Sequence, residues 1–182
     1  MRVRELHEEF PWTEGVPRGD YIHLSDTINV MAEQIRDSFG EIYDATRMQF
    51  EKGYLWEVAL STAFGAKASH PKTGLNLDEV FISPDGLSYD RKGNMVVEEY
   101  KCTSKSPDTN PTSMWRWMMQ AKGYCKVLGT TKAIFRILHM TFVPTYKVWE
   151  LTFTQAEIDE NWAAVVAARD CIRRGTDHGK IT

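Results

Sequence analysis

The sequence contains few of the residues that usually hold zinc, iron–sulfur clusters or disulfide frameworks. Cysteine occurs three times, at Cys102, Cys125 and Cys171, without a C-x-x-C pair, and the five histidines show no H-x-H or H-E-x-x-H spacing. Such an odd and scattered set of cysteines argues against disulfides, a structural zinc site and an iron–sulfur cluster within one chain. Any metal would therefore bind to oxygen ligands, which favours Mg²⁺ or Mn²⁺.

Long apolar runs are also absent. No stretch approaches the roughly 18 apolar residues that a membrane span needs, and residues 1–9, MRVRELHEE, lack the apolar core of a signal peptide. We therefore expect a soluble, cytoplasmic protein with no membrane partner. The sequence has no G-x-x-x-x-G-K-[ST] loop and no G-x-G-x-x-G turn, which argues against a nucleotide-binding enzyme.

The composition is that of one ordinary globular domain spanning residues 1–182, with 42% hydrophobic residues. Its net charge of −3 argues against a protein that coats nucleic acid non-specifically. Positive charge is concentrated in residues 101–147, where Asp108 is the only acid. This window predicts either a basic face that holds a polyanion or, alternatively, an ordinary solvated surface.

Periodicity and turn residues predict an alternation of helices and strands. Residues 1–24, which contain four Pro or Gly, are expected to form an arm with at most a short helix. Helices are predicted for residues 25–39, 42–64, 113–128 and 154–174, the last opened by a capping box. Strands are predicted for residues 79–83 with a continuation at 87–89, and for 95–102, 132–142 and 146–153.

The rest of the chain is organised around residues 95–101, MVVEEYK, where an apolar strand ends in charged residues. Successive side chains of a strand point to opposite faces, so Glu99 and Lys101 share one face while Glu98 and Tyr100 share the other. A charged pair at the end of a central strand is costly to desolvate. A divalent metal bound by Glu99 would compensate for that cost.

Other polar residues surround this strand in a fixed order along the chain. Glu57 is an acid within an apolar helical segment, and Asp85 follows a strand in the turn S-P-D-G. The hairpin that follows can bring Asp85 near Glu99. Gln120 and Tyr124, together with Arg116, share a helix face at i, i+4 spacing. Each signal alone is weak, since Asp85 could simply form a turn; their order is what makes them informative.

These residues resemble the motifs of the PD-(D/E)xK nuclease superfamily, in its RecB-like branch that includes lambda-type phage exonucleases. The match spans roughly residues 47–128: G-x-x-x-E at Glu57, H-P leading to I-S-P-D-G-L at Asp85, V-E-E-Y-K-C at Glu99 and Lys101, and Q-x-x-x-Y at Gln120. The resemblance implies a restriction-endonuclease-like α/β core, a mixed sheet flanked by helices. It also implies a metal-dependent DNA exonuclease.

Residue by residue, the resemblance assigns Glu57, Asp85 and Glu99 as metal carboxylates, Lys101 as the catalytic lysine, and Gln120 and Tyr124 as a fourth motif. The Tyr100 backbone carbonyl would be a further oxygen ligand for Mg²⁺ or Mn²⁺. Three basic residues are expected to contact flanking phosphates: Lys105, Arg116 and Lys122. Trp115 and Trp117 could stack on an unpaired base, although core packing is the favoured interpretation.

Alternatives stay open on the sequence alone. The same site would serve an endonuclease acting on branched or flapped DNA, and a non-catalytic DNA-binding subunit could share the fold. The presence of all three carboxylates and the lysine at motif spacing argues against a non-catalytic subunit. The resemblance leans towards DNA recombination, repair or degradation in a phage or bacterial cytoplasm. Whether the protein forms a homo-oligomer, or acts beside a single-strand-annealing or recombination protein, stays open as well.

Overall fold

The larger of two sheets is built around the strand at residues 95–103. The computed structural model describes residues 21–31, 44–64 and 75–175. Its four-stranded sheet has the order β4 (Gly86–Tyr89), β5 (Met95–Thr103), β6 (Lys132–His139) and β7 (Thr145–Thr152). β5 and β6 run parallel, whereas β4 and β7 are antiparallel to their neighbours. A parallel pair needs a crossover connection, which here contains a helix. The mixed sheet predicted from the sequence is confirmed.

A smaller sheet has the order β1 (Ile22–His23), β3 (Val80–Ile82) and β2 (Leu75–Leu77). This sheet corrects two predictions. Residues 79–83 and 87–89 were expected to form one interrupted hairpin arm, but the chain changes sheets at Pro84, between β3 and β4. Ile22 and His23 were assigned to an irregular arm and instead pair with Val80 and Phe81. Strands this short carry too few residues for their period to be read.

The helices agree closely with their sequence signals. α2 (Asp44–Phe64), α3 (Trp115–Leu128) and α4 (Gln155–Arg174) match predicted helices, and α1 (Leu24–Met31) begins one residue before its predicted start. The predicted residues 32–39 of that helix, and residues 42–43, lie outside the described part. Thr154 and Glu157 form the predicted capping box of α4. Residues 113–114 were predicted to be α-helical, but Pro111–Ser113 form a short 3₁₀ helix, η2, and α3 starts at Trp115.

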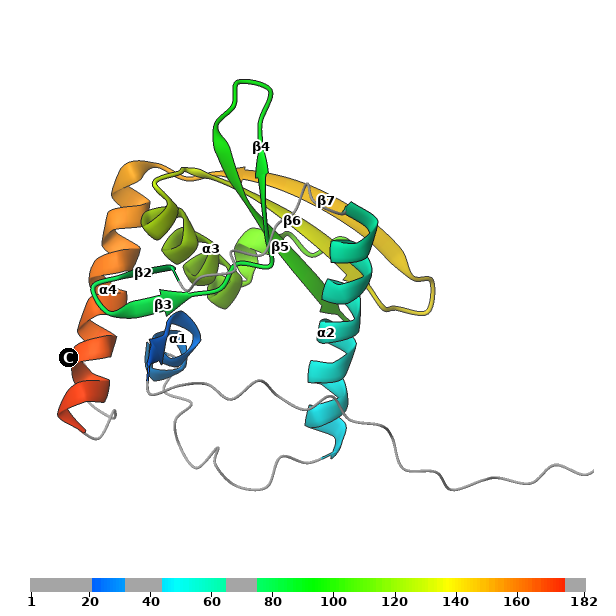
Figure 1. Ribbon diagram of the computed structural model, residues 1–182. Helices are drawn as coiled ribbons and strands as arrows, with labels where there is room; N and C mark the ends of the chain where they lie inside the picture. Colours follow the sequence, from blue (N-terminus) through cyan, green and yellow to red (C-terminus); the bar gives the residue numbers. More distant parts are fainter. Residues whose placement is uncertain (1–20, 32–43, 65–74, 176–182) are drawn as a thin grey trace, which may run out of the picture.

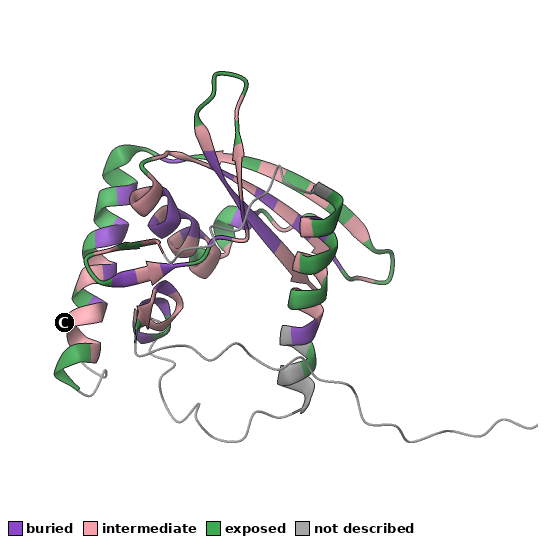
Figure 2. Cartoon of the chain, in the orientation of Figure 1, coloured by how far each residue is buried: buried purple, intermediate pink, exposed green. Residues whose placement is uncertain are grey.

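The main core lies on the β5–β6 face that α3 covers (Figure 1). Phe135 and Ile137 of β6 pack there against α3, and α4 adds Trp162 and Val165 from outside. α2 lies on the opposite face, where Leu60 and Trp56 pack against Tyr100. Figure 2 shows that buried residues concentrate on β5, β6 and α3, while much of α2 is exposed. The strand β5 is thus covered on both faces.

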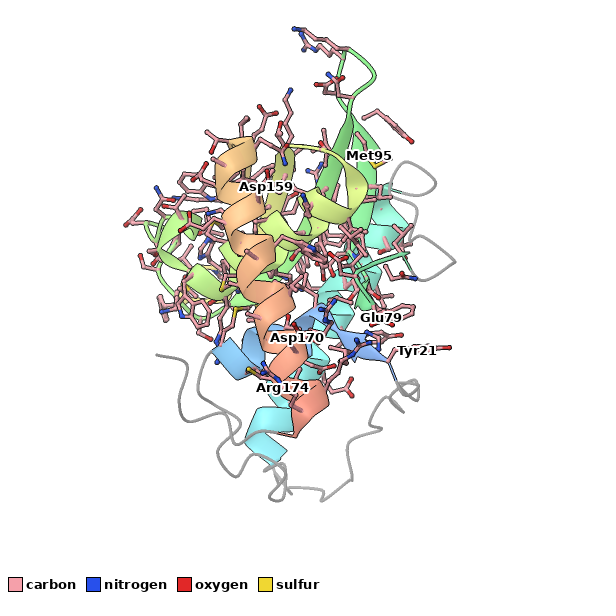
Figure 3. The ribbon with its side chains drawn as sticks, turned by 90° about the vertical axis from the view of Figure 1, so that its left-hand side faces the viewer. Tyr21, Glu79, Met95, Asp159, Asp170 and Arg174 are labelled. Atoms are coloured by element: carbon pink, nitrogen blue, oxygen red, sulfur yellow. The ribbon has the colours of Figure 1, made fainter. Side chains whose placement is uncertain are left out.

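α4 also fastens the smaller sheet to the rest of the molecule. Trp162 Nε1 donates to Asp78 Oδ2 at 2.7 Å, and Arg169 donates to the Asp78 carbonyl at 2.5 Å. Arg173 forms an ion pair with Glu79. Figure 3 shows Asp170 and Arg174 of α4 on the same side as Glu79. In the described part of the chain, no helix is long and apolar enough to cross a membrane.

Two helical glycines offer a matched test of this packing. A methyl group at Gly123 of α3 would lie 2.7 Å from Cδ2 of Leu24, a side chain only 2% exposed. At Gly53 of α2 it would meet nothing within 4 Å. We expect Gly53→Ala to raise the free energy of unfolding by about 0.5–1 kcal/mol through helix propensity. Gly123→Ala should lower it by about 1–2 kcal/mol through overpacking. Urea denaturation measures both, and equal stabilisation by the two substitutions would show that α1 and α3 are not tightly packed at Leu24.

Candidate active site

Glu99 and Lys101 project from β5 towards α3, on the face that carries the main core. Glu99 is completely buried, with 0% of its surface exposed, whereas Lys101 is partly exposed. The Lys101 ammonium forms a close ion pair with Glu99 Oε2 and lies 3.8 Å from Asp85 Oδ2. Two carboxylates therefore share one cation at the edge of the core.

Asp85 reaches this position because β4 is short. Pairing between β4 and β5 ends at Gly86 and Glu98, so the β5 backbone beyond Glu98 has no β4 partner. The Asp85 carboxylate fills that place: its Oδ2 accepts the Tyr100 backbone N–H at 2.6 Å. The N–H and C=O of one strand residue point to the same edge, so the Tyr100 carbonyl is directed to the Asp85 side. The structure thus brings Asp85 next to Glu99, as the predicted hairpin required.

α3 contributes a chain of hydrogen bonds to the same place. Lys101 Nζ donates to Gln120 Oε1 at 3.1 Å, and Gln120 Nε2 donates to the Tyr124 hydroxyl at 2.7 Å. The hydroxyl in turn donates to the Ser83 carbonyl at 3.0 Å. One turn of helix separates Gln120 from Tyr124, so both face β5. The Ser83 carbonyl belongs to this network as well, and no sequence pattern pointed to it, because any residue could supply a backbone carbonyl.

Glu57 comes from α2, on the other side of β5. Its charge is close enough to influence the pKa values of Glu99, Lys101 and Tyr124. Trp56, the preceding residue, donates from Nε1 to the Arg136 carbonyl at 3.4 Å and packs edge-on against Tyr146. An open hollow of about 330 Å³ on α2 is lined by Tyr54, Glu57, Val58, Ser61 and Thr62. Glu57 therefore lies at an open surface of α2, and its charge is felt by Glu99 and Lys101.

Burial and the nearby carboxylates shift the pKa values of three residues of the site. Burial acts to raise the pKa of Glu99 above its ordinary value, an effect that Lys101 opposes and that the Asp85 and Glu57 charges reinforce. Burial acts to lower the pKa of Lys101, but Glu99 and Asp85 outweigh it and raise that pKa above its ordinary value. Burial also raises the pKa of Tyr124 well above its ordinary value. Lys101 is thus held as a cation and Tyr124 as a neutral phenol.

The oxygen atoms of this site suit a hard cation. Glu99 Oε1 is buried and has no hydrogen-bond partner among the described residues, and a buried unpaired carboxylate oxygen is costly. Asp85 and the Tyr100 carbonyl lie on the adjacent edge of β5, and oxygen donors of these types bind Mg²⁺ or Mn²⁺. Within the described residues, no three His, Cys, Asp or Glu side chains are close enough together to hold a metal ion. The donor types thus fit a hard cation, while the described carboxylates do not lie close enough together in this structure to hold one.

The opposite face of β5 carries a second buried acid with a different environment. Arg136 donates to both oxygens of Glu98, from Nε at 2.6 Å and from Nη2 at 3.1 Å, and Ser88 Oγ donates at 2.7 Å. Such a bidentate contact is strong and geometrically specific. Glu98 is fully paired, so it stabilises the contact of β5 with β4 and β6.

The residues predicted to contact DNA are not placed together. Arg116 lies one helical turn before Gln120, on the same side of α3. Lys105 is an exposed residue of the loop after β5, and its carbonyl is bonded by His139 Nδ1 at 3.0 Å. Lys122 instead lies 3.8 Å from Glu157 and 5.6 Å from the Phe153 ring centroid. Two residues correspond to about 200° around a helix, so Lys122 is on the far side of α3 from Gln120.

The basic window does not form one continuous face. Six of its basic residues are engaged with acids: Lys101 with Glu99, Lys122 with Glu157, Lys126 with Asp159, Lys132 with Asp90, Arg136 with Glu98 and Lys147 with Asp108. Most of these partners lie outside residues 101–147, so the local excess of positive charge is balanced by tertiary contacts. The prediction of a basic face is corrected accordingly.

Comparison with known proteins identifies the fold. No protein-family model and no curated protein matches the sequence. The crystal structure of SSO0001 matches with a TM-score of 0.60 and 16% identity, over 90% of this chain and 80% of that one. An alkaline exonuclease (LHK-Exo) from Laribacter hongkongensis matches with a TM-score of 0.50 and 18% identity, over 85% of this chain and 89% of that one. The chain therefore has a fold that also occurs in an exonuclease.

The hydrogen-bond network from α3 can be tested with a single-atom change. Tyr124→Phe removes the hydroxyl and leaves the Ser83 carbonyl and the Gln120 amide without their buried partner. We expect the free energy of unfolding to fall by about 1–3 kcal/mol. Tyr89→Phe is the control, because Tyr89 is 68% exposed and should change stability by less than about 0.5 kcal/mol. If denaturant titrations gave the same change in unfolding free energy for both substitutions, the hydrogen bonds of the Tyr124 hydroxyl would not contribute to stability.

Proposed function

We propose that the protein is a Mg²⁺- or Mn²⁺-dependent DNA exonuclease of the PD-(D/E)xK superfamily. The observation that carries the proposal is the position of the Lys101 ammonium, which contacts Glu99, Asp85 and Gln120 at once. These residues come from separate motifs of the sequence, and their contacts with one ammonium group support the proposal. The resemblance to RecB-like and lambda-type nucleases supports the proposal, as does the presence of the same fold in an alkaline exonuclease.

The residues of the site have separate roles in this proposal. Lys101, held as a cation, donates hydrogen bonds that orient the attacking water and stabilise negative charge on the phosphate. Gln120 fixes the Lys101 ammonium through its amide oxygen, and Tyr124 fixes Gln120. Asp85 holds the β5 backbone at Tyr100 through its Oδ2. These contacts hold the lysine in position to orient the water for its in-line attack on a phosphodiester.

The acidic residues would hold the metal. Glu99, Asp85 and Glu57, with the Tyr100 carbonyl, are the proposed ligands for Mg²⁺ or Mn²⁺, which when bound lowers the pKa of water and neutralises charge on the phosphate oxygens. The buried, unpartnered Oε1 of Glu99 supports this assignment, since a cation there would satisfy it. Lys105 and Arg116 remain the proposed contacts to flanking phosphates, whereas the position of Lys122 gives that residue no support.

The biological setting is proposed from the resemblance. DNA is the expected substrate, in recombination, repair or degradation within a phage-infected or bacterial cytoplasm. A homo-oligomer and a single-strand-annealing or recombination partner belong to the same proposal. An endonuclease acting on branched DNA is the closest alternative, because it would use the same residues.

Nuclease activity is tested on two DNA forms in parallel. End-labelled linear duplex and closed circular duplex are incubated with Mg²⁺, Mn²⁺ or EDTA. We expect metal-dependent loss of the linear DNA alone, with the position of the label giving the polarity. Lys101→Ala should reduce the rate by roughly 100-fold or more, because the water and phosphate lose their cation. Lys92→Ala, which changes an exposed lysine in the β4–β5 turn, should leave the rate unchanged.

The other outcomes separate the alternatives. Nicking of the circle would identify an endonuclease. Binding of DNA without cleavage of either form would identify a non-catalytic subunit. Full activity of Lys101→Ala would refute the role given to the lysine.

Metal binding is a separate prediction. Asp85→Ala removes one proposed ligand, and we expect Mn²⁺ affinity measured by calorimetry to fall at least roughly tenfold. Asp108→Ala is the control, since this loop carboxylate is 95% exposed and is not among the proposed ligands. Unchanged Mn²⁺ affinity in Asp85→Ala would remove Asp85 from the ligand set.

A further inference from the structure

We propose that Trp115 and Arg116 form a binding site for an unpaired base and its phosphate, so that the protein engages a single-stranded end of its substrate. The inference rests on the proposed nuclease function and extends it to the class of substrate. It concerns two neighbouring residues at the start of α3.

The structure separates the two tryptophans that the sequence left equivalent. Trp117 is stacked on Phe135 with an interplanar angle of 22° and a centroid distance of 6.2 Å, at the edge of the main core. Trp115 has 46% of its surface exposed. A single exposed aromatic residue is common on protein surfaces and is not a site by itself. The neighbouring charge is what distinguishes Trp115.

Arg116 is arranged against the indole. Its guanidinium carbon lies 5.5 Å from the centroid of the Trp115 ring, within the range of a cation–π contact. Arg116 Nη1 also donates to Asn29 Oδ1 of α1 at 3.5 Å, so the guanidinium is held from two directions. The flat indole ring can stack on a base, and the guanidinium beside it can bind the phosphate of the same nucleotide. Base stacking on aromatic side chains, combined with positive charge for the backbone, is how proteins bind single strands.

The pair lies close to the proposed site of cleavage. Arg116 and Gln120 are one turn apart on α3, and Gln120 contacts Lys101. At 1.5 Å per residue, Trp115 and Arg116 precede Gln120 by roughly 6–8 Å along the helix. Stacked nucleotides are spaced by about 3.4 Å along one strand. Arg116 is on the Gln120 side of α3, whereas Trp115 lies about 140° around the helix from Gln120. A strand whose phosphate reaches Lys101 therefore meets Trp115 by continuing past Arg116.

The geometry also indicates that this base is unpaired. The faces of bases inside a duplex are covered by their neighbours in the stack, so an indole can reach a base face only where pairing and stacking have ended. A single-stranded or frayed end provides such a base, and every base offers a ring face, so the contact is tolerant of sequence.

The test measures binding of a short fluorescent DNA single strand by anisotropy, in EDTA so that no cleavage occurs. Trp115→Ala should weaken binding roughly 5- to 100-fold, the range found for loss of one stacked base. Trp115→Phe should retain most of the affinity, because a ring remains. Phe142→Ala is the matched control: Phe142 is 102% exposed, lies in the β6–β7 loop and should not matter.

A second arm uses the wild-type protein and removes one base at a time from the DNA. At one position, loss of the base should weaken binding by the wild type but not by Trp115→Ala, since both changes remove the same contact. Thermal melting checks that Trp115→Ala folds; if it does not, Trp115→Leu takes its place in this comparison. Equal affinity of wild type and Trp115→Ala, or no sensitive base position, would overturn the inference while leaving the nuclease proposal standing.

Two further results are decisive. An equal loss for single-stranded and blunt duplex DNA would also overturn the inference, because stacking on an unpaired base requires a difference between them. Failure of the wild type to bind or cleave any DNA would refute the nuclease function itself, and the inference with it.

Discussion

The arrangement of this protein depends on the ion pair between Lys101 and Glu99 on the core face of β5. Taking two charges out of water is costly, and their mutual attraction offsets the cost only where further polar groups complete their bonding. Asp85 and Gln120 provide those groups for Lys101. Asp85 can do so because β4 stops at Gly86, and Gln120 because α3 packs directly on β5. The early end of β4 and the packing of the crossover helix α3 on β5 therefore allow these charged side chains to lie beside the apolar core.

Two adjacent residues of β5 show how similar side chains acquire different roles. Glu98 and Glu99 are both buried carboxylates, on opposite faces of one strand. Glu98 receives three hydrogen bonds, from Arg136 and Ser88, and its charge is fully compensated. Glu99 has Lys101 at one oxygen and no donor at the other, among further acids that raise its pKa. A compensated carboxylate stabilises a fold, whereas an under-compensated one favours a cation. The contrast supports assigning Glu99, and not Glu98, to chemistry.

Sequence patterns predicted the long elements well and the short ones poorly. α3 and α4 extend over several turns, so their apolar period, the capping box at Thr154 and the glycine after each helix act together. β1 and β2 hold two and three residues, too few for a period. The change of sheet at Pro84 could not be predicted either, because an interruption within a hairpin arm and a passage between sheets have the same local sequence. The basic window was misread since its balancing acids are distant in the chain.

Local sequence periods are enough to predict which residues share a face of a strand or a helix. Alternation along a strand places Glu99 with Lys101, and the helical repeat places Gln120 with Tyr124, because backbone geometry fixes both periods. The order of the motifs is likewise a property of the sequence. Which of these faces meet depends on tertiary packing. In the folded chain α3 covers Glu99, and α2 brings Glu57 from the other side. Packing also places Trp117 in the core and leaves Trp115 exposed. These outcomes depend on packing between segments far apart in the chain, which no local period encodes.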